Sequence, residues 1–183
     1  MALLTLAEAK AQLDIDTTTS DTELQAYIDA LTPVIERFTG PVENRSVTET
    51  VSGRGTMLAL AQVPAVSLAS VTPVLNGGLA IDVGDLVLDG DAGIVRRLDG
   101  GTFYGGPWIF VYTAGRGSVS PTINLAARIL LQHLWSTQYG AARGNVGGAS
   151  DYSVSEPVAG WGYAVPNRVL QLLEPFKVPP GVA

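Results

Sequence analysis

The chain has 183 residues, of which 46% are hydrophobic, so it is long and apolar enough to bury a core and is not generally disordered. It contains no cysteine and one histidine, which excludes disulfides, thiol nucleophiles and multi-histidine metal sites. The formal net charge of −6 opposes general nucleic-acid binding, which needs clustered Lys and Arg. No apolar run approaches the ~20 residues of a membrane helix and no signal-peptide pattern opens the chain, so we expect a soluble, unsecreted protein.

Two helices are predicted within the first 40 residues. Thr5-Leu-Ala-Glu8 is a capping box, which predicts a short helix over roughly residues 5–13. The same pattern at Ser20-Asp-Thr-Glu23 precedes an apolar stripe with helical spacing that ends at Gly40. Pro33 lies inside this second helix and should bend its axis without ending it.

From residue 41 to residue 113 the pattern changes to short alternating or β-branched runs separated by Gly, Asn and Asp, which is typical of antiparallel hairpins. The turns Asn76-Gly-Gly78 and Asp89-Gly-Asp-Ala-Gly93 should each join antiparallel neighbours. Pro64 and Pro73 should lie at strand starts or edges. The expected strands are 46–51, 57–60, 66–74, 79–83, 86–88, 94–97 and 108–112.

The stretch from Trp108 to Tyr139 should hold the centre of the fold. An uninterrupted aromatic and β-branched run, 108–112, predicts a strand in the middle of a sheet. Ser120 and Pro121 suit the cap and first position of a long helix whose wide apolar stripe belongs in a core, with Gly140 as its stop.

The C-terminal part should contain a loop, a short helix and an extended tail. Residues 140–150 are rich in glycine and lack periodicity, which indicates a loop or arm. Pro166 should open a last helix that Pro175 ends.

The predicted fold class is therefore α+β, a small bundle of about four helices with an inserted antiparallel β-sheet and hairpin region. We expect a single domain over 1–183, made of helical parts 1–40 and 115–176, a β part 41–114, a loop 140–165 and a tail 177–183.

Several patterns that suggest chemistry favour structural interpretations. Gly115-Arg-Gly117 lies between a strand and a helix but lacks the third glycine and the acid of a dinucleotide-binding site. Four acids of the predicted hairpins, Asp82, Asp85, Asp89 and Asp91, do not fit a calcium loop. His133 has no triad pattern, so a hydrogen-bonded helix residue is the better interpretation. The dispersed arginines 54, 96, 97, 116 and 143 are interpreted as surface or interface residues. We therefore predict no catalytic residue, metal or cofactor.

The order of elements resembles the head–tail connector, or adaptor, proteins of long-tailed bacteriophages, and in particular those of actinobacterial phages. The resemblance rests on LTLAEAKAQLDID, SDTELQAYIDALTPVIERFTG, LVLDGDAGIVRRLDGG, VYTAG, WSTQYG and VPNRVLQLLEPFKVP, which occur in that order across nearly the whole chain. The segment 140–163 has no counterpart in this pattern.

This resemblance implies a structural protein that is not an enzyme. It would form a dodecameric ring beneath the portal protein, receive the stopper or tail-completion protein, and let DNA pass without binding it specifically. It would act in the virion neck after assembly in the host cytoplasm, with no membrane partner. Two other classes remain open: a hydrolase or small-ligand binder that uses the acidic hairpins, and a carbohydrate-binding β module.

Two groups of residues are expected to contact the portal or a neighbouring subunit, and a third to face the channel. The proline-stiffened tail should dock through its apolar residues, and aromatic residues of the segment 140–163 should act as interface anchors. The four hairpin acids should face the lumen and repel DNA phosphates. The interface candidates are Phe176, Val178, Pro179, Pro180, Val182, Tyr152, Trp161 and Tyr163; the lumen candidates are Asp82, Asp85, Asp89 and Asp91.

Overall fold

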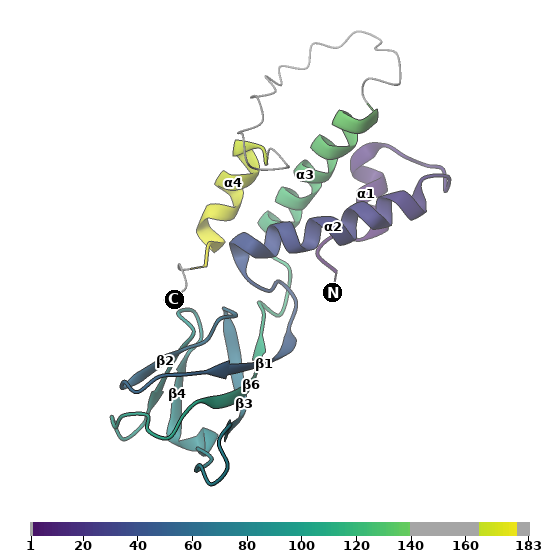
Figure 1. The fold of residues 1–183 in the computed structure, drawn as a ribbon. Helices are drawn as coiled ribbons and strands as arrows, with labels where there is room; N and C mark the ends of the chain where they lie inside the picture. Colours follow the sequence, from purple (N-terminus) through teal and green to yellow (C-terminus); the bar gives the residue numbers. More distant parts are fainter. Residues whose placement is uncertain (1, 140–164, 179–183) are drawn as a thin grey trace. The chain divides into compact units, whose positions relative to one another are not determined.

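The computed structural model describes residues 2–139 and 165–178 and divides the chain into two compact units (Figure 1). Of the described residues, the helical unit comprises 2–35, 120–139 and 165–175, and the β unit comprises 36–119 and 176–178. The fold is α+β, as predicted, and the strands all lie in the β unit. That the chain acts as a single domain stays a prediction.

Local signals place the helices close to where the sequence predicts them. Helix α1 (Leu6–Leu13) begins with the predicted capping box, in which the Thr5 side chain accepts from Glu8 N–H at 3.2 Å and Glu8 accepts from Thr5 N–H at 2.9 Å. Helix α2 (Asp21–Thr39) continues through Pro33 and ends before Gly40. Helix α3 (Pro121–Tyr139) has proline at its first position, and α4 (Asn167–Leu173) follows Pro166. The predicted stop of α3 at Gly140 lies outside the described residues.

The helical unit is held by an apolar core and by polar ties between helices. Helix α3 packs against both α1 and α4. Arg128 on α3 donates to Glu8 on α1 at 2.8 Å, and Asn124 donates to the Leu3 carbonyl at 2.9 Å. No helix in the described ranges is long and apolar enough to cross a bilayer. The fully buried large side chains of the helical unit are Leu4, Leu24, Leu31, Ile35, Ile123, Leu130, Leu131 and Leu173.

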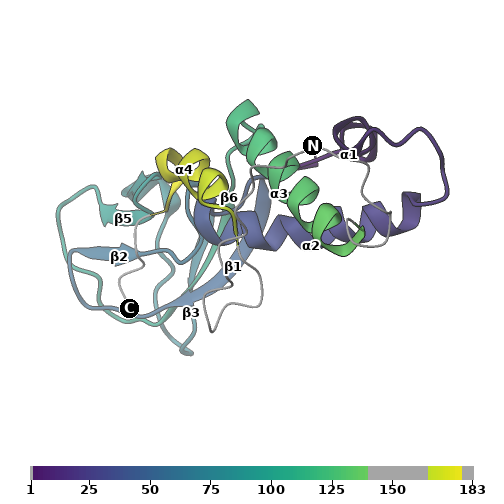
Figure 2. The same cartoon turned by 90° about the horizontal axis from the view of Figure 1, so that it is seen from above.

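The β unit consists of two small antiparallel sheets. Strand β6 (Trp108–Ala114) lies between β1 (Arg45–Val51) and β3 (Ala65–Pro73), which confirms the predicted central strand. In the second sheet β5 (Ile94–Arg97) lies between β2 (Met57–Ala59) and β4 (Leu86–Asp89), with β2 and β5 labelled in Figure 2. Alternate residues of β6 point into the core, where Trp108, Phe110 and Tyr112 are almost completely buried.

Apart from shifts of a residue or two at boundaries, one predicted strand and one predicted helix end differ from the structure. Residues 79–83 do not form a strand; Ile81 makes a single antiparallel bridge to Val71, and the chain then enters the 3-10 turn η1 (Val83–Asp85). The Asp82 carboxylate accepts a hydrogen bond from Gly84 N–H at 2.8 Å. This side-chain bond stabilises the turn, so the segment does not form the backbone hydrogen bonds of a β-ladder. Pro175 does not end α4, because the helix already ends at Leu173. Pro175 lies within the 3-10 turn η2 (Glu174–Phe176). The φ angle of a 3-10 turn is close to the value that the proline ring fixes, so proline fits there.

Candidate assembly surfaces of the β unit

The first residues of the C-terminal tail are held against the β unit by Arg116. Its guanidinium Nη2 donates to the Thr39 carbonyl at 2.9 Å and to the Phe176 carbonyl at 2.8 Å, and its Cζ lies 5.5 Å from the centre of the Phe176 ring. Val178 N–H donates to the Phe38 carbonyl at 2.9 Å. Residues 176–178 therefore have a defined position at the end of α2.

The electrostatics of this contact suit an arginine. Thr39 is the last residue of α2, where helix carbonyls lack intrahelical donors and the helix dipole favours a cation. Burial lowers the pKa of the Arg116 guanidinium, and the negative charge of Asp91 opposes that shift. The side chain is half-buried, so the interpretation of Arg116 as a surface or interface residue missed its contacts within the β unit. The only sequence signal for this contact is the position of Arg116, directly after the β6 strand and Gly115.

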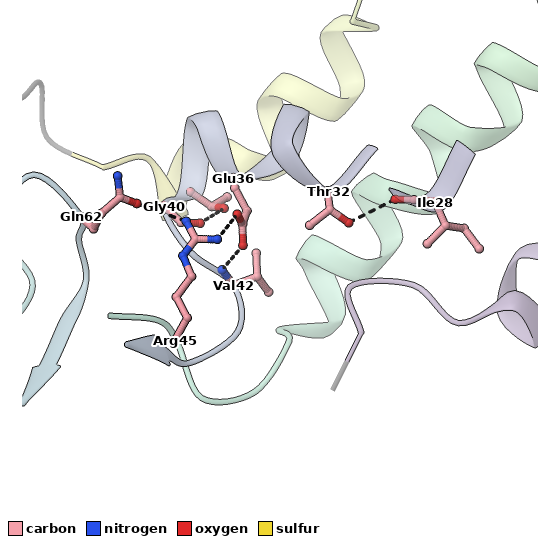
Figure 3. Close-up of polar contacts among 8 residues, drawn as sticks. Ile28, Thr32, Glu36, Gly40, Val42, Arg45 and Gln62 are labelled. Atoms are coloured by element: carbon pink, nitrogen blue, oxygen red, sulfur yellow. Dashed lines mark hydrogen bonds and ion pairs between the residues drawn. The ribbon is translucent and has the colours of Figure 1, made fainter. Parts of the chain in front are cut away.

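The chain leaving α2 is fixed by Glu36 and Gly40 (Figure 3). Glu36 accepts from Val42 N–H at 3.0 Å and from Arg45 Nη1 at 2.8 Å, and Arg45 also donates to Gln62 at 3.2 Å. Gly40 has φ +70°, and a Cβ there would lie 1.7 Å from the Val63 carbonyl oxygen. This position therefore requires glycine, for its backbone conformation and for its close approach.

Three loops of the β unit meet at the opposite end of the sheets from this junction. The register pairs both Val51 of β1 and Pro73 of β3 with Trp108, so loops 52–56, 74–82 and 98–107 leave the same end of the first sheet. Phe103 N–H donates to Gly55 O at 2.9 Å, and Val74 N–H donates to Pro107 O at 3.0 Å. These bonds join the three loops directly.

Large apolar side chains are exposed on these loops. Leu79 is 86% exposed, Tyr104 76% and Leu98 64%. A contiguous exposed apolar patch marks an interaction site more often than scattered single residues do, and these residues lie on loops that leave the same end of the first sheet. Sequence reasoning missed this surface, although Leu79 and Tyr104 each follow or precede paired glycines in turn segments. We name five exposed side chains of the three loops, with Met57 at the start of β2, the apolar loop end: Met57, Val74, Leu75, Leu79, Leu98 and Tyr104.

The four predicted lumen acids do not form one cluster. All are exposed, but Asp82 and Asp85 precede β4, Asp89 is its last residue, and Asp91 follows it. Asp85 and Asp89 are four residues apart along an extended strand, or ~13 Å, which exceeds the screening length at physiological salt. Asp89 accepts from Ala92 N–H at 3.3 Å within the hairpin turn. Whether these acids face a channel stays a prediction.

The other singled-out residues have ordinary surroundings. His133 is half-buried on α3, and its carbonyl accepts from Ser136 Oγ at 3.0 Å. Arg97 pairs with Asp99 at 2.8 Å, and this hydrogen bond lowers the Asp99 pKa to about 2. Over the described ranges no three His, Cys, Asp or Glu side chains are placed to hold a metal ion. Of the proposed interface residues, Tyr152, Trp161, Tyr163, Pro179, Pro180 and Val182 lie outside the described residues, as does Arg143.

Comparisons with known proteins agree on one kind of relative. A family model described as head completion protein matches residues 2–178. A chain in the neck of an empty gene transfer agent particle, computed with C6 symmetry, is 21% identical with a TM-score of 0.65, and the match covers 98% of this chain and 92% of that chain. A chain in the neck of a native particle, computed with C12 symmetry, is 19% identical with a TM-score of 0.58, over 97% and 90%.

A chain in the virion of a native gene transfer agent particle is also similar, at 19% identity and a TM-score of 0.60, over 98% of this chain and 92% of that chain. At these identities the three structures show a shared fold. No curated protein matches this chain.

Proposed function

Because this chain belongs to the head completion protein family and is a structural head-to-tail adaptor, we propose that it forms a ring in the neck of a tailed phage virion. The ring lies beneath the portal protein, receives the stopper or tail-completion protein, and surrounds the path of the DNA. The observation that carries the proposal is the family match over residues 2–178. An origin in an actinobacterial phage remains a prediction from the sequence resemblance.

A ring of twelve is consistent with the symmetric necks in which chains of this fold occur. Repetition around an axis lets a small subunit enclose a channel, since head-to-tail contacts generate a closed ring when the rotation closes. We propose twelve copies, assembled in the host cytoplasm and retained in the virion neck.

The role is structural and not catalytic. The rival interpretation, a hydrolase or ligand-binding β module, required the hairpin acids to line a pocket. Asp82 and Asp89 accept hydrogen bonds from their own turns, and the two pairs of acids lie at opposite ends of β4. That arrangement does not favour the rival.

The proposed ring lets DNA pass without binding it. Twelve copies at a formal charge of −6 each give −72, and an acidic wall repels phosphates where a basic wall would bind them with strong salt dependence. Only charges within about 8–10 Å of the duplex act at physiological salt. Asp82, Asp85, Asp89 and Asp91 are the proposed lumen-facing acids.

The tail is proposed to dock on the portal or on an adjacent subunit. Its root at Phe176 and Val178 is bound to the β unit of its own chain, so the docking segment begins at residue 179. Proline-rich extended segments lose little entropy on binding, which suits such a segment to a groove on a neighbour.

Purified chain, the portal protein of the same virus, and their mixture should be compared by mass in solution. We expect the chain to join the portal in a complex of defined stoichiometry, and images of the virion neck to show a ring of this chain below the portal. A chain that stays monomeric beside portal and is missing from neck density would refute the proposal.

A further inference from the structure

Helix α2 is shared by the two units of the chain. Its residues 21–35 belong to the helical unit, and its residues 36–39 belong to the β unit. Leu31 is buried on the helical-unit side of this boundary. Glu36, on the other side, accepts hydrogen bonds from two residues of the β unit. Residues 32–35 therefore join two helical segments, each of which is fixed in a different unit.

The segment 32–35 is also the weakest part of α2. Pro33 has no N–H, so the Asp29 carbonyl lacks the helical hydrogen bond that any other residue at position 33 would donate. The other three residues of the segment are β-branched and have low helix propensity. The Thr32 hydroxyl donates to the Ile28 carbonyl at 3.1 Å (Figure 3), and side-chain bonds of this kind often bend helices. These features concentrate the compliance of α2 at the boundary between the units.

The chain passes between the units at two other points, and both links are short. The link between β6 and α3 crosses after Val119, two residues beyond Gly117, which has φ +77°. The link after α4 crosses between Pro175 and Phe176, and Arg116 holds the Phe176 carbonyl on the β-unit side. Links this short limit any relative motion of the units to a bend about α2.

We propose that residues 32–35 form a hinge in α2, and that bending at this hinge changes the orientation of the helical unit relative to the β unit. The missing hydrogen bond at Pro33 makes the bend less costly. The ties of Glu36 make the β unit follow the last turn of the helix. In a ring the two units meet different neighbours, and a hinge lets one subunit satisfy both sets of contacts. This use rests on the proposed function, whereas the hinge itself is a property of the isolated chain.

Spin labels on two introduced cysteines measure the motion, because the chain has no cysteine of its own. One label replaces Leu125 on α3 and the other replaces Val66 on β3, so the pair spans the two units through exposed positions. A second pair, at Val66 and Val87, lies within the β unit and gives the width expected of a rigid unit. Pulsed electron paramagnetic resonance gives the distance distributions. Labelled chain diluted in excess unlabelled chain reports only distances within one molecule.

The deciding variant is Pro33→Ala, which restores the N–H that bonds to the Asp29 carbonyl and favours the helix, so it should fold. The matched control is Pro73→Ala, at the end of β3. We expect the distance distribution between the units to be broader than that within the β unit. It should narrow to about half its width in Pro33→Ala. It should stay unchanged in Pro73→Ala.

Hydrogen exchange of the wild-type chain is a second measurement that needs no variant. Amides of residues 34–37 should exchange at least about tenfold faster than those of residues 25–31, because the hinge opens locally. Equal protection of these two parts of α2, or a distance distribution that Pro33→Ala leaves unchanged, would overturn the hinge.

The proposed use of the hinge is tested in the assembled ring. There the distance distribution between the units should narrow, since the neighbours impose one orientation. A ring in which the distribution stays as broad as in the free chain would refute this use. If no ring forms, the proposed function fails, and the measurements on the free chain still decide whether the hinge exists.

Discussion

Replacing Arg116 with Ala should destabilise the β unit and release the root of the tail. The substitution removes hydrogen bonds to two carbonyls, those of Thr39 and Phe176, and the stacking on the Phe176 ring. The two acceptors lie 77 and 60 residues from Arg116 in the sequence. This one side chain therefore connects three distant segments.

The size of the effect follows from these contacts. Hydrogen bonds that involve a charged group contribute ~1.5–3 kcal/mol each, and a partly exposed cation–π contact about 0.5–1 kcal/mol. Desolvation of the guanidinium, which lowers the Arg116 pKa, opposes these gains. We therefore expect the Arg116→Ala substitution to lower the free energy of unfolding of the β unit by about 2–4 kcal/mol.

Urea denaturation, followed by the fluorescence of Trp108 in a background where it is the only tryptophan, measures this quantity because Trp108 lies in the core of the β unit. Arg116→Lys should lose roughly half as much, since an ammonium lacks the fork that reaches both carbonyls. Arg54→Ala, at an exposed arginine of the same unit, is the control and should change stability by less than about 0.5 kcal/mol.

Truncation separates the root of the tail from its docking segment. A chain ending at Val178 should keep wild-type stability but lose recruitment to the portal, whereas a chain ending at Pro175 should lose both. Hydrogen exchange at Val178 N–H, which is bonded to Phe38 O, should become fast in Arg116→Ala. If Arg116→Ala unfolds within about 0.5 kcal/mol of the wild type and Val178 N–H stays protected, the assignment of Arg116 as the residue that holds the tail is wrong.

Three further predictions concern Gly40, Glu8 and two of the hairpin acids. Gly40→Ala should cost more than about 3 kcal/mol of unfolding free energy because it combines a positive φ with a backbone collision, whereas Gly77→Ala, with a positive φ but open space, should cost only about 1–2 kcal/mol; equal losses in denaturant titrations would contradict this. The hydrogen bonds to Thr5 hold the Glu8 pKa at about 2, below its ordinary 4.5, so its stabilisation is complete above pH 4.5 and declines as the pH falls towards 2. Glu8→Gln should therefore be about 1 kcal/mol less stable than wild type at pH 7, a value discounted for exposure, and the two should converge near pH 2; a difference independent of pH would exclude the charge as its source. Changing Asp85 and Asp91 to Lys should slow DNA release from virions most at low salt; release at wild-type rates across ionic strengths, in virions that contain the variant ring, would remove both acids from the lumen.

The family and the fold class could be predicted from the sequence because their signals are local and ordered along the chain. The capping box of α1 involves residues three apart, and Pro121 and Gly40 mark helix ends within a single turn. The β4–β5 hairpin follows from turn residues that adjoin both strands. The order of these local elements supports the resemblance to phage connectors, and the head completion family match over residues 2–178 agrees with it.

The predicted strand over 79–83 shows where local patterning fails. Leu79 and Ile81 alternate with small or polar residues as a strand would, yet only Ile81 makes a bridge, and the Asp82 side chain bonds to the turn that follows. The sequence offers both conformations at this point. Which conformation forms depends on whether a partner strand is available for pairing. Here residues 79–83 pair with β3 through a single bridge, between Ile81 and Val71.

The sequence by itself determined the helices, the β4–β5 hairpin and the absence of thiol chemistry, since each depends on residue type or on neighbours within a few positions. The tertiary structure alone decided that Arg116 reaches Thr39 and Phe176, and that three loops bring Leu79 and Tyr104 to one end of the β unit. Contacts between segments 60 or more residues apart can form only after long loops close, and loop closure costs conformational entropy. The favourable free energy of the complete core offsets this cost. No short window of sequence records that outcome.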